Sequence, residues 1–172
     1  MLKISRQKKQ ASDWLTIAEA KLYLKVDSDA DDGVIQQLIA GVRDITEMYL
    51  QRSVVINIIT LNTDKSEIAL PFGPVDTITS VTDDDGNDVE YTWDGTTLTS
   101  DQHMVISVTA GVSSNLSQVV YESDGVLSEG LKTAMLQVLA KFYDHRGDED
   151  MFSNSMMWAN TNLQPYREFV WI

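Results

Sequence analysis

Apolar residues between Ser128 and Gly147 recur three and four positions apart, which places them on one face of a helix of about five turns. The stripe consists of Leu131, Ala134, Met135, Val138, Leu139 and Phe142. Ser128 is suited to cap the amino end, and Gly147 to take the left-handed conformation after the last turn. The pattern predicts a helix over 128–146 whose stripe packs against another part of the chain.

Two further helical patterns lie in the first third of the chain. Thr16 followed by Glu19 is a capping box, which predicts a helix over 16–25. A second apolar stripe predicts a helix over 32–51, and it consists of Ile35, Leu38, Ile39, Val42, Ile45 and Tyr49. Both long stripes need a partner, so we expect helices 32–51 and 128–146 to pack on each other.

Four aspartates stand between the first two predicted helices, within residues 27–32. Their alternation resembles a calcium loop, but an EF-hand loop starting at Asp27 would need glycine at Asp32 and glutamate at Leu38. We favour the interpretation that Asp31 and Asp32 cap the following helix and stabilise the positive end of its dipole.

The section from 53 to 110 has a different period. β-branched and apolar residues, separated by turns rich in proline, glycine and aspartate, predict about six short strands between 54 and 109. They are expected over 54–61, 67–70, 75–81, 89–93, 97–99 and 104–109. The acidic run Asp83–Asp85 before Gly86 is explained by turn chemistry rather than by a catalytic carboxylate cluster. The sequence thus predicts an α+β protein, a helical bundle with an inserted antiparallel β section, followed by an irregular loop over 111–125.

The two ends of the chain differ in character. Residues 1–14 are polar and basic, and we expect a flexible arm that is either frayed or reaches towards a neighbour. After an acidic break, residues 151–172 carry Met and aromatic clusters of the kind that adaptable interfaces favour. We expect this tail to be mobile in the free protein and ordered on a partner, and its candidate contacts are Met156, Met157, Trp158, Tyr166, Arg167, Phe169 and Trp171.

Charge is the unusual feature of the composition. The 172 residues carry a net charge of −13, although Lys3, Arg6, Lys8 and Lys9 make the first ten residues basic. Such a field opposes nucleic-acid binding, yet it suits a surface that DNA slides past. There is no cysteine, which excludes disulfides, and no apolar run approaches the ~20 residues of a membrane helix.

The sequence shows no catalytic or metal-binding pattern. His103 and His145 are its only histidines, and without cysteine a zinc site is not expected. No phosphate-binding glycine loop or nucleophile elbow is present. His145, beside Arg146 near a predicted helix end, fits helix-end electrostatics better than general-base chemistry. We therefore expect a non-enzymatic interaction protein with no cofactor.

A series of short motifs follows in order along the chain. They are Leu15–Ile35 with its capping box and aspartates, Leu70–Val75 with Ser80-Val81, Val108–Gly111, Leu131–Arg146 ending in Tyr143-x-x-Arg146, and Leu163–Arg167. In this order they resemble the head–tail connector proteins, also called adaptor or neck proteins, of long-tailed bacteriophages. The resemblance covers nearly the whole chain.

The resemblance implies a homo-oligomeric ring beneath the portal protein at the capsid vertex. Packaged DNA would pass through the ring without sequence-specific binding, and a stopper, neck or tail protein would dock on it. The protein would be located in the virion neck, and in the host cytoplasm during assembly. Residues 15–147 would form the connector domain with its β insertion at 53–110, and residues 148–172 would be a docking tail that contacts the portal or a neighbouring subunit.

Two other classes remain open from the residues alone. A metal-dependent hydrolase or nuclease would use Asp27, Asp29 and Asp83–Asp85. An acidic DNA mimic would stay monomeric and bind or inhibit a host DNA-processing enzyme.

Overall fold

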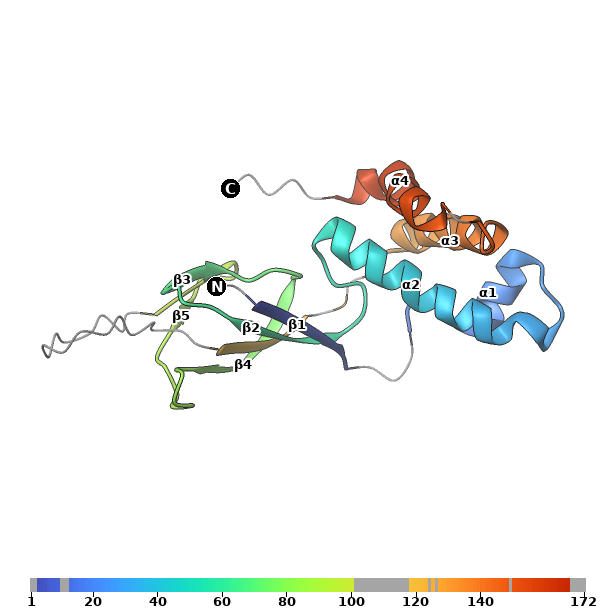
Figure 1. The fold of residues 1–172 in the computed structure, drawn as a ribbon. Coiled ribbons are helices and arrows are strands. Elements are labelled where there is room, and N and C mark those ends of the chain that lie inside the picture. Colours follow the sequence, from blue (N-terminus) through green and yellow to red (C-terminus); the bar gives the residue numbers. More distant parts are fainter. Residues whose placement is uncertain are drawn as a thin grey trace, which may run out of the picture. The chain divides into compact units, whose positions relative to one another are not determined.

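The computed structural model describes residues 3–9, 13–100, 118–123, 125, 127–148 and 150–167. It has the predicted α+β fold and divides into two compact units (Figure 1). The β unit comprises Met1–Lys9 and Ile56–Asp124, and the helical unit comprises Gln10–Val55 and Gly125–Ile172. The β section is therefore inserted into the helical unit, and the amino-terminal stretch of the chain belongs to the β unit.

The helical unit contains the three predicted helices and one more. Its elements are α1 (Ile17–Leu24), the 3-10 turn η1 (Asp29–Asp31), α2 (Asp32–Leu50), α3 (Glu129–Asp144), α4 (Met151–Leu163) and the 3-10 turn η2 (Gln164–Tyr166). The capping box of α1 is present in full, because Thr16 and Glu19 each accept from the other's backbone N–H. Ser128 caps α3 by accepting from the N–H of Leu131. None of the helices in the described ranges is long and apolar enough to span a membrane.

The helices share one hydrophobic core. Both predicted stripes face it, and α2 packs on α3 as expected. Leu139 and Met135 are fully buried, and the indole N–H of Trp14 donates to the carbonyl oxygen of Ile39 at 2.8 Å. This hydrogen bond fixes the segment before α1 onto α2.

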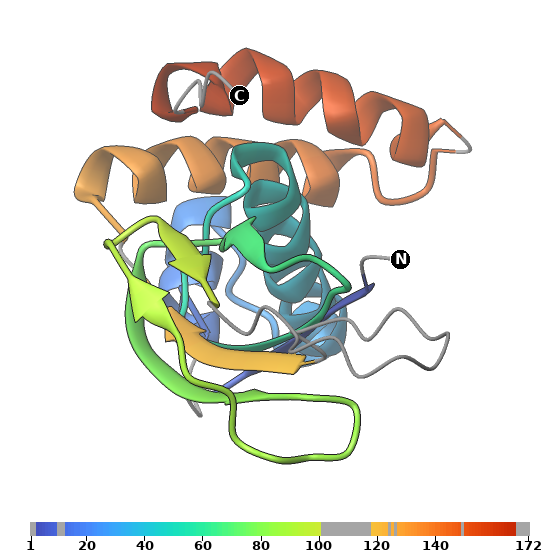
Figure 2. The ribbon, with the colours of Figure 1, turned by 90° about the vertical axis from the view of Figure 1, so that its left-hand side faces the viewer.

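The carboxy-terminal segment differs from the expectation of a mobile tail. Residues 151–163 form α4, which packs on α2 and α3, and α3 and α4 lie side by side in both ribbon views (Figures 1 and 2). Trp158, Ala159 and Leu163 are buried in the same core as the stripes of α2 and α3. These three side chains complete the core, so residues 151–167 belong to the helical unit.

The described residues of the β unit form two antiparallel sheets. The larger has the order β1 (Lys3–Lys8), β2 (Asn57–Asn62), β7 (Gln118–Ser123) and β4 (Val75–Thr82). The smaller has the order β3 (Glu67–Ala69), β6 (Thr97–Thr99) and β5 (Thr92–Trp93). In Figure 2, β7 runs beside β4. A separate core beneath the sheets contains Ile59, Leu61, Phe72, Val81, Val89 and Leu98.

Two strands were not expected from the sequence. Residues 3–8 are not a frayed arm, because they pair with β2 from Lys3 opposite Asn62 to Lys8 opposite Asn57. Residues 118–123, expected to be part of an irregular loop, form the inner strand β7 between β2 and β4. The strand expected at 104–109 lies outside the described residues.

Candidate interaction surface

The outer face of α4 is an uncharged surface in a highly charged protein. Charged residues make up 23% of the chain, yet residues 151–166 contain none. Met156 is 42% exposed and Met157 is 56% exposed. A scarcity of charged residues together with exposed methionine side chains is typical of the centre of a protein–protein interface. These two predicted contact residues are therefore placed where a partner could reach them.

Trp158, the third predicted contact residue of this cluster, points the other way. It is 7% exposed, and its ring centroid lies 5.5 Å from that of Phe142 and 5.2 Å from that of His145. Nδ1 of His145 is in turn 2.7 Å from a carboxylate oxygen of Asp148. Trp158 and His145 therefore hold α4 against the carboxyl end of α3, so Trp158 is a core residue rather than an exposed contact.

The end of the described tail is tied to α2 and α3. Tyr166 lies so close to Gly130 that a Cβ added to Gly130 would be 2.8 Å from the tyrosine hydroxyl oxygen. The guanidinium of Arg167 lies 5.2 Å from the ring centroid of Tyr49, and the hydroxyl of Tyr49 donates to Oδ1 of Asn160 at 2.7 Å. Tyr166 and Arg167 thus anchor the chain end, while the predicted contacts Phe169 and Trp171 lie outside the described residues.

The Tyr143-x-x-Arg146 motif is brought together with the aspartate run. The Tyr143 hydroxyl donates to Oδ2 of Asp31, and Arg146 lies 3.7 Å from the same oxygen and 4.2 Å above the Tyr143 ring. This hydrogen bond to a carboxylate raises the pKa of Tyr143. Asp31 makes no side-chain cap on α2, so its role is to join η1 to α3 rather than to cap a helix.

The other aspartates of the run surround a lysine. The ammonium of Lys21 lies 2.5 Å from Asp29 and 2.9 Å from Asp32. The hydrogen bond from Lys21 lowers the pKa of Asp29, and the two carboxylates raise the pKa of Lys21, with Asp29 as the larger cause. The cap of η1 is Ser28, which accepts from the N–H of Ala30. No group of residues suited to a metal ion occurs in the described ranges.

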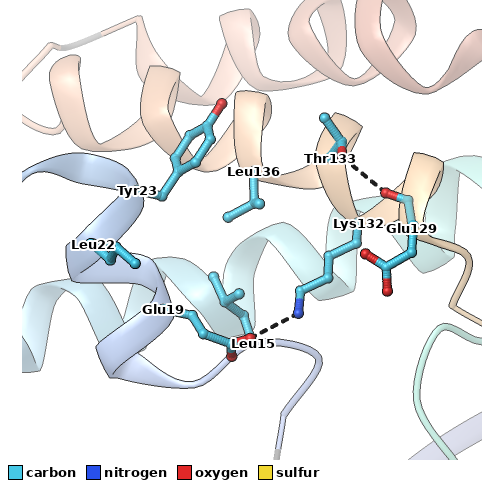
Figure 3. A pocket seen from close by; sticks show the side chains of 8 residues that line it. All are labelled: Leu15, Glu19, Leu22, Tyr23, Glu129, Lys132, Thr133 and Leu136. Atoms are coloured by element: carbon cyan, nitrogen blue, oxygen red, sulfur yellow. Dashed lines mark hydrogen bonds and ion pairs between the residues drawn. The ribbon is translucent and has the colours of Figure 1, made fainter.

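A groove between α1 and α3 was missed by the sequence analysis (Figure 3). Its volume is about 480 Å³, and it is lined by Leu15, Glu19, Leu22, Tyr23, Glu129, Lys132, Thr133 and Leu136. Leu22, on α1, is 82% exposed at this groove. Lys132 bonds to Glu19 at 2.9 Å across the groove. The hydrogen bonds from Thr16, with that of Lys132, lower the pKa of Glu19 to about 2.

The acidic turns of the β unit are held by backbone hydrogen bonds, as expected. Oδ1 of Asp83 accepts from the N–H groups of Asp85 and Asn87, and Oδ1 of Asp94 accepts from those of Thr96 and Thr97. These bonds lower the pKa of both carboxyls; the side chain of Asn87 is the largest cause for Asp83, and the Thr97 N–H is the largest for Asp94. The carboxylates of Asp83 and Asp94 therefore shape these turns.

Comparison with solved structures finds the same fold in phage-like particles. A chain of the virion of the native gene transfer agent particle matches with a TM-score of 0.58 and 14% identity, over 89% of this chain and 94% of that chain. A chain of the neck of the empty gene transfer agent particle, computed with C6 symmetry, matches with a TM-score of 0.59 and 15% identity. The match covers 90% of this chain and 94% of that chain. A chain of the neck of the native gene transfer agent particle, computed with C12 symmetry, matches with a TM-score of 0.55 and 15% identity. This match also covers 90% of this chain and 94% of that chain.

Sequence comparison gives the family directly. No curated protein matched the chain. The family model described as phage gp6-like head-tail connector protein matches residues 15–115, which is more than half of the chain. The match begins at Leu15, the first residue of the motif series, and continues through α1, α2 and most of the β section. The chain therefore belongs to the phage gp6-like head–tail connector protein family, and its role is that of a structural connector.

Proposed function

We propose that this chain forms the connector ring directly beneath the portal protein and that packaged DNA passes through this ring. The observation that carries the proposal is the family match over residues 15–115. The likeness to neck chains of gene transfer agent particles, found over nearly the full length of both chains, supports it. The subunits of such a ring make heterologous contacts, in which one face meets a different face of the next copy.

The charge of the chain supports the passage of DNA. A net charge of −13 repels a polyanion, so a wall built from these subunits lets DNA slide without forming phosphate contacts that would have to be broken. The DNA-mimic alternative uses the same charge but needs a monomer that binds an enzyme. It does not account for the match to a connector family.

The exposed methionines of α4 are the surface that we assign to portal docking. Met156 and Met157 lie on an uncharged helix whose other face is fixed in the core by Trp158 and Leu163. A rigid helix that presents adaptable apolar side chains loses little entropy on binding. The groove between α1 and α3, whose lining combines leucines with the Lys132–Glu19 ion pair, is a second surface, and we assign it to the stopper, neck or tail protein that follows.

Binding to purified portal tests the assignment. The variant Met156→Asp/Met157→Asp places two charges on the docking face and should abolish ring attachment to portal, seen by electron microscopy and co-sedimentation. Its melting temperature should stay near that of the wild type, because both side chains are exposed. The matched control is Gln137→Asp, an exposed site on α3, which should bind normally.

The two parts of the proposal fail in different ways. If the wild-type chain forms no complex with portal, the connector position itself is wrong. If the wild type and the double variant attach equally well, the ring stands but the portal contacts lie elsewhere on the chain. Capture of a host DNA-processing enzyme by a monomer would instead favour the DNA mimic.

A further inference from the structure

The larger sheet of the β unit has two outer strands, β1 and β4, in the part of the chain that the structure describes. An outer strand exposes backbone N–H and C=O groups that can pair with a strand of another chain. The end of β4 is covered by its own hairpin, since the N–H of Val89 donates to the carbonyl oxygen of Val81 at 2.9 Å. The remaining stretch of β4, residues 75–80, has the same six-residue length as β1.

The two edges carry opposite charge. β1 and the residue that follows it contain four basic residues and no acidic one, namely Lys3, Arg6, Lys8 and Lys9. The β4 edge and the turn after it contain five acidic residues and no basic one, namely Asp76, Asp83, Asp84, Asp85 and Asp88. Because copies of a chain with a net charge of −13 repel one another, a contact between copies is favoured where a basic edge meets an acidic one.

The apolar layer beneath the sheet is incomplete at both edges. Ile4 stands opposite Leu61 in the register, so the two side chains share a face. Leu61 is fully buried, whereas Ile4 is 42% exposed. At the other edge Val75 and Ile78 pack on the same core but are only half-buried. A strand added beside β1 would remove Ile4 from water, and a strand added beside β4 would cover Val75 and Ile78, so each addition favours the contact.

The strand directions agree with a ring. Every neighbouring pair in the sheet is antiparallel, so β1 and β4 run in opposite directions. Neighbours in a ring of many subunits differ by a small rotation, and the β1 strand of the next subunit therefore keeps nearly the direction of β1 in the first. It can accordingly lie antiparallel to β4, with Lys3 towards the acidic turn and Lys8 towards Asp76.

We propose that β1 of each subunit pairs with residues 75–80 of β4 in the next copy of the chain, so that the sheets join around the ring. The partner is thus a second copy of this chain, and the inference rests on the ring proposed above. Two register shifts in β4, between Val75 and Thr77 and between Ile78 and Ser80, give this strand the extra bend that a curved sheet needs. Basic residues on an edge can also serve to block pairing, but blocking alone does not explain the acidic opposite edge or the exposed Ile4.

Paired cysteines test this contact, because the natural chain has none. Ser5 faces away from the core, and Ser80 and Thr77 lie on the same face of the sheet. In the variant Ser5→Cys/Thr77→Cys the two thiols meet if Ser5 of one copy lies opposite Thr77 of the next. In Ser5→Cys/Ser80→Cys they meet if Ser5 lies opposite Ser80. On mild oxidation at least one should give a ladder of covalent trimers and larger species. The controls are Ser5→Cys alone and Ser5→Cys/Thr96→Cys, which places the second thiol on an exposed turn; both should stop at dimers.

A charge exchange provides an independent readout. Lys3→Glu and Asp84→Lys should each reduce the yield of the ladder by several-fold in the double-cysteine background, and together they should restore it. Thermal melting checks that each variant is folded. Rings visible by electron microscopy without a ladder from either cysteine pair would overturn the edge pairing and leave the proposed ring in place. A chain that stays monomeric at high concentration, without a ladder, would overturn the self-pairing, whereas failure to bind portal would count against the proposed function only.

Discussion

Replacement of Leu163 by alanine tests whether the carboxy-terminal segment belongs to the core. The Leu163 side chain is fully buried in the helical core, at the end of α4. Removing its three carbons leaves a cavity, and substitutions of this kind cost about 2–5 kcal/mol of unfolding free energy. For a protein of this size that loss corresponds to a fall in melting temperature of about 4–20 °C.

Two other leucines supply matched comparisons. Leu139 lies in the middle of the predicted stripe of α3, and its side chain is also fully buried. Leu139→Ala should therefore cost a similar amount of unfolding free energy. Leu22→Ala removes the same side chain from a site that is 82% exposed and should change the stability by less than about 0.5 kcal/mol. The series separates the loss of a core contact from a general effect of leucine removal.

The measurement is chemical denaturation followed by circular dichroism at the helix band, which reports mainly on the helical unit. Because the chain has two compact units, the helical transition must be fitted on its own rather than as one two-state step. If Leu163→Ala behaves like Leu22→Ala while Leu139→Ala is destabilising, α4 does not contribute to the core and the packing described above is wrong. Truncation after Asp150 is expected to expose the α2 and α3 surfaces and to unfold the helical unit. A truncated chain that stays folded would likewise show that α4 does not contribute to the core.

Two smaller predictions concern polar contacts of the helical unit. The pKa of Glu19 falls from 4.5 to about 2 on folding, so the ionised side chain stabilises the fold above pH 4.5 and this stabilisation is lost as the pH falls towards 2. Because the side chain is half exposed, the stabilisation amounts to less than about 1 kcal/mol. Glu19→Gln should remove this part of the pH dependence of the unfolding free energy, which denaturation curves between pH 2 and pH 4.5 measure. Tyr143→Phe removes the hydrogen bond to Asp31 and should lower the melting temperature. An equal fall in an Asp31→Ala background, where no acceptor is left, would show that the bond contributes nothing.

The helical part of the fold could be predicted because its signals are local. Thr16, Glu19 and Ser128 cap helices within a few residues of themselves, and the stripes of α2 and α3 depend only on spacing. The capping box therefore holds in the structure as predicted, with both reciprocal hydrogen bonds present. Resemblance to the connector family added what spacing could not provide, and the family match confirms it.

The errors arose where a segment depends on a distant partner. The basic residues of β1 suggested a solvated arm, and only pairing with β2, more than forty residues away, makes this stretch a strand. In α4 the polar residues Asn154, Asn160 and Asn162 dilute the apolar pattern, so the inward position of Trp158 could not be separated from an outward one. Asp31 was expected to cap its own helix but instead bonds to Tyr143, 112 positions along the chain. Such choices are decided by tertiary contacts rather than by the local sequence.

The charge of the chain restricts where its contacts can form. In the ring that we propose, the repulsion that would keep DNA off the subunits would also act between neighbouring subunits, because each copy carries the same charge of −13. Contacts are therefore favoured only on surfaces that lack charge or that bring opposite charges together. In the described ranges α4 is a surface of the first kind, and the β1 and β4 edges form a pair of the second kind. The first suits a partner of different sequence, such as portal, because it imposes no charge pattern on that partner. The second suits a copy of the same chain, since a basic edge and an acidic edge present on every subunit complement each other all the way around a closed ring.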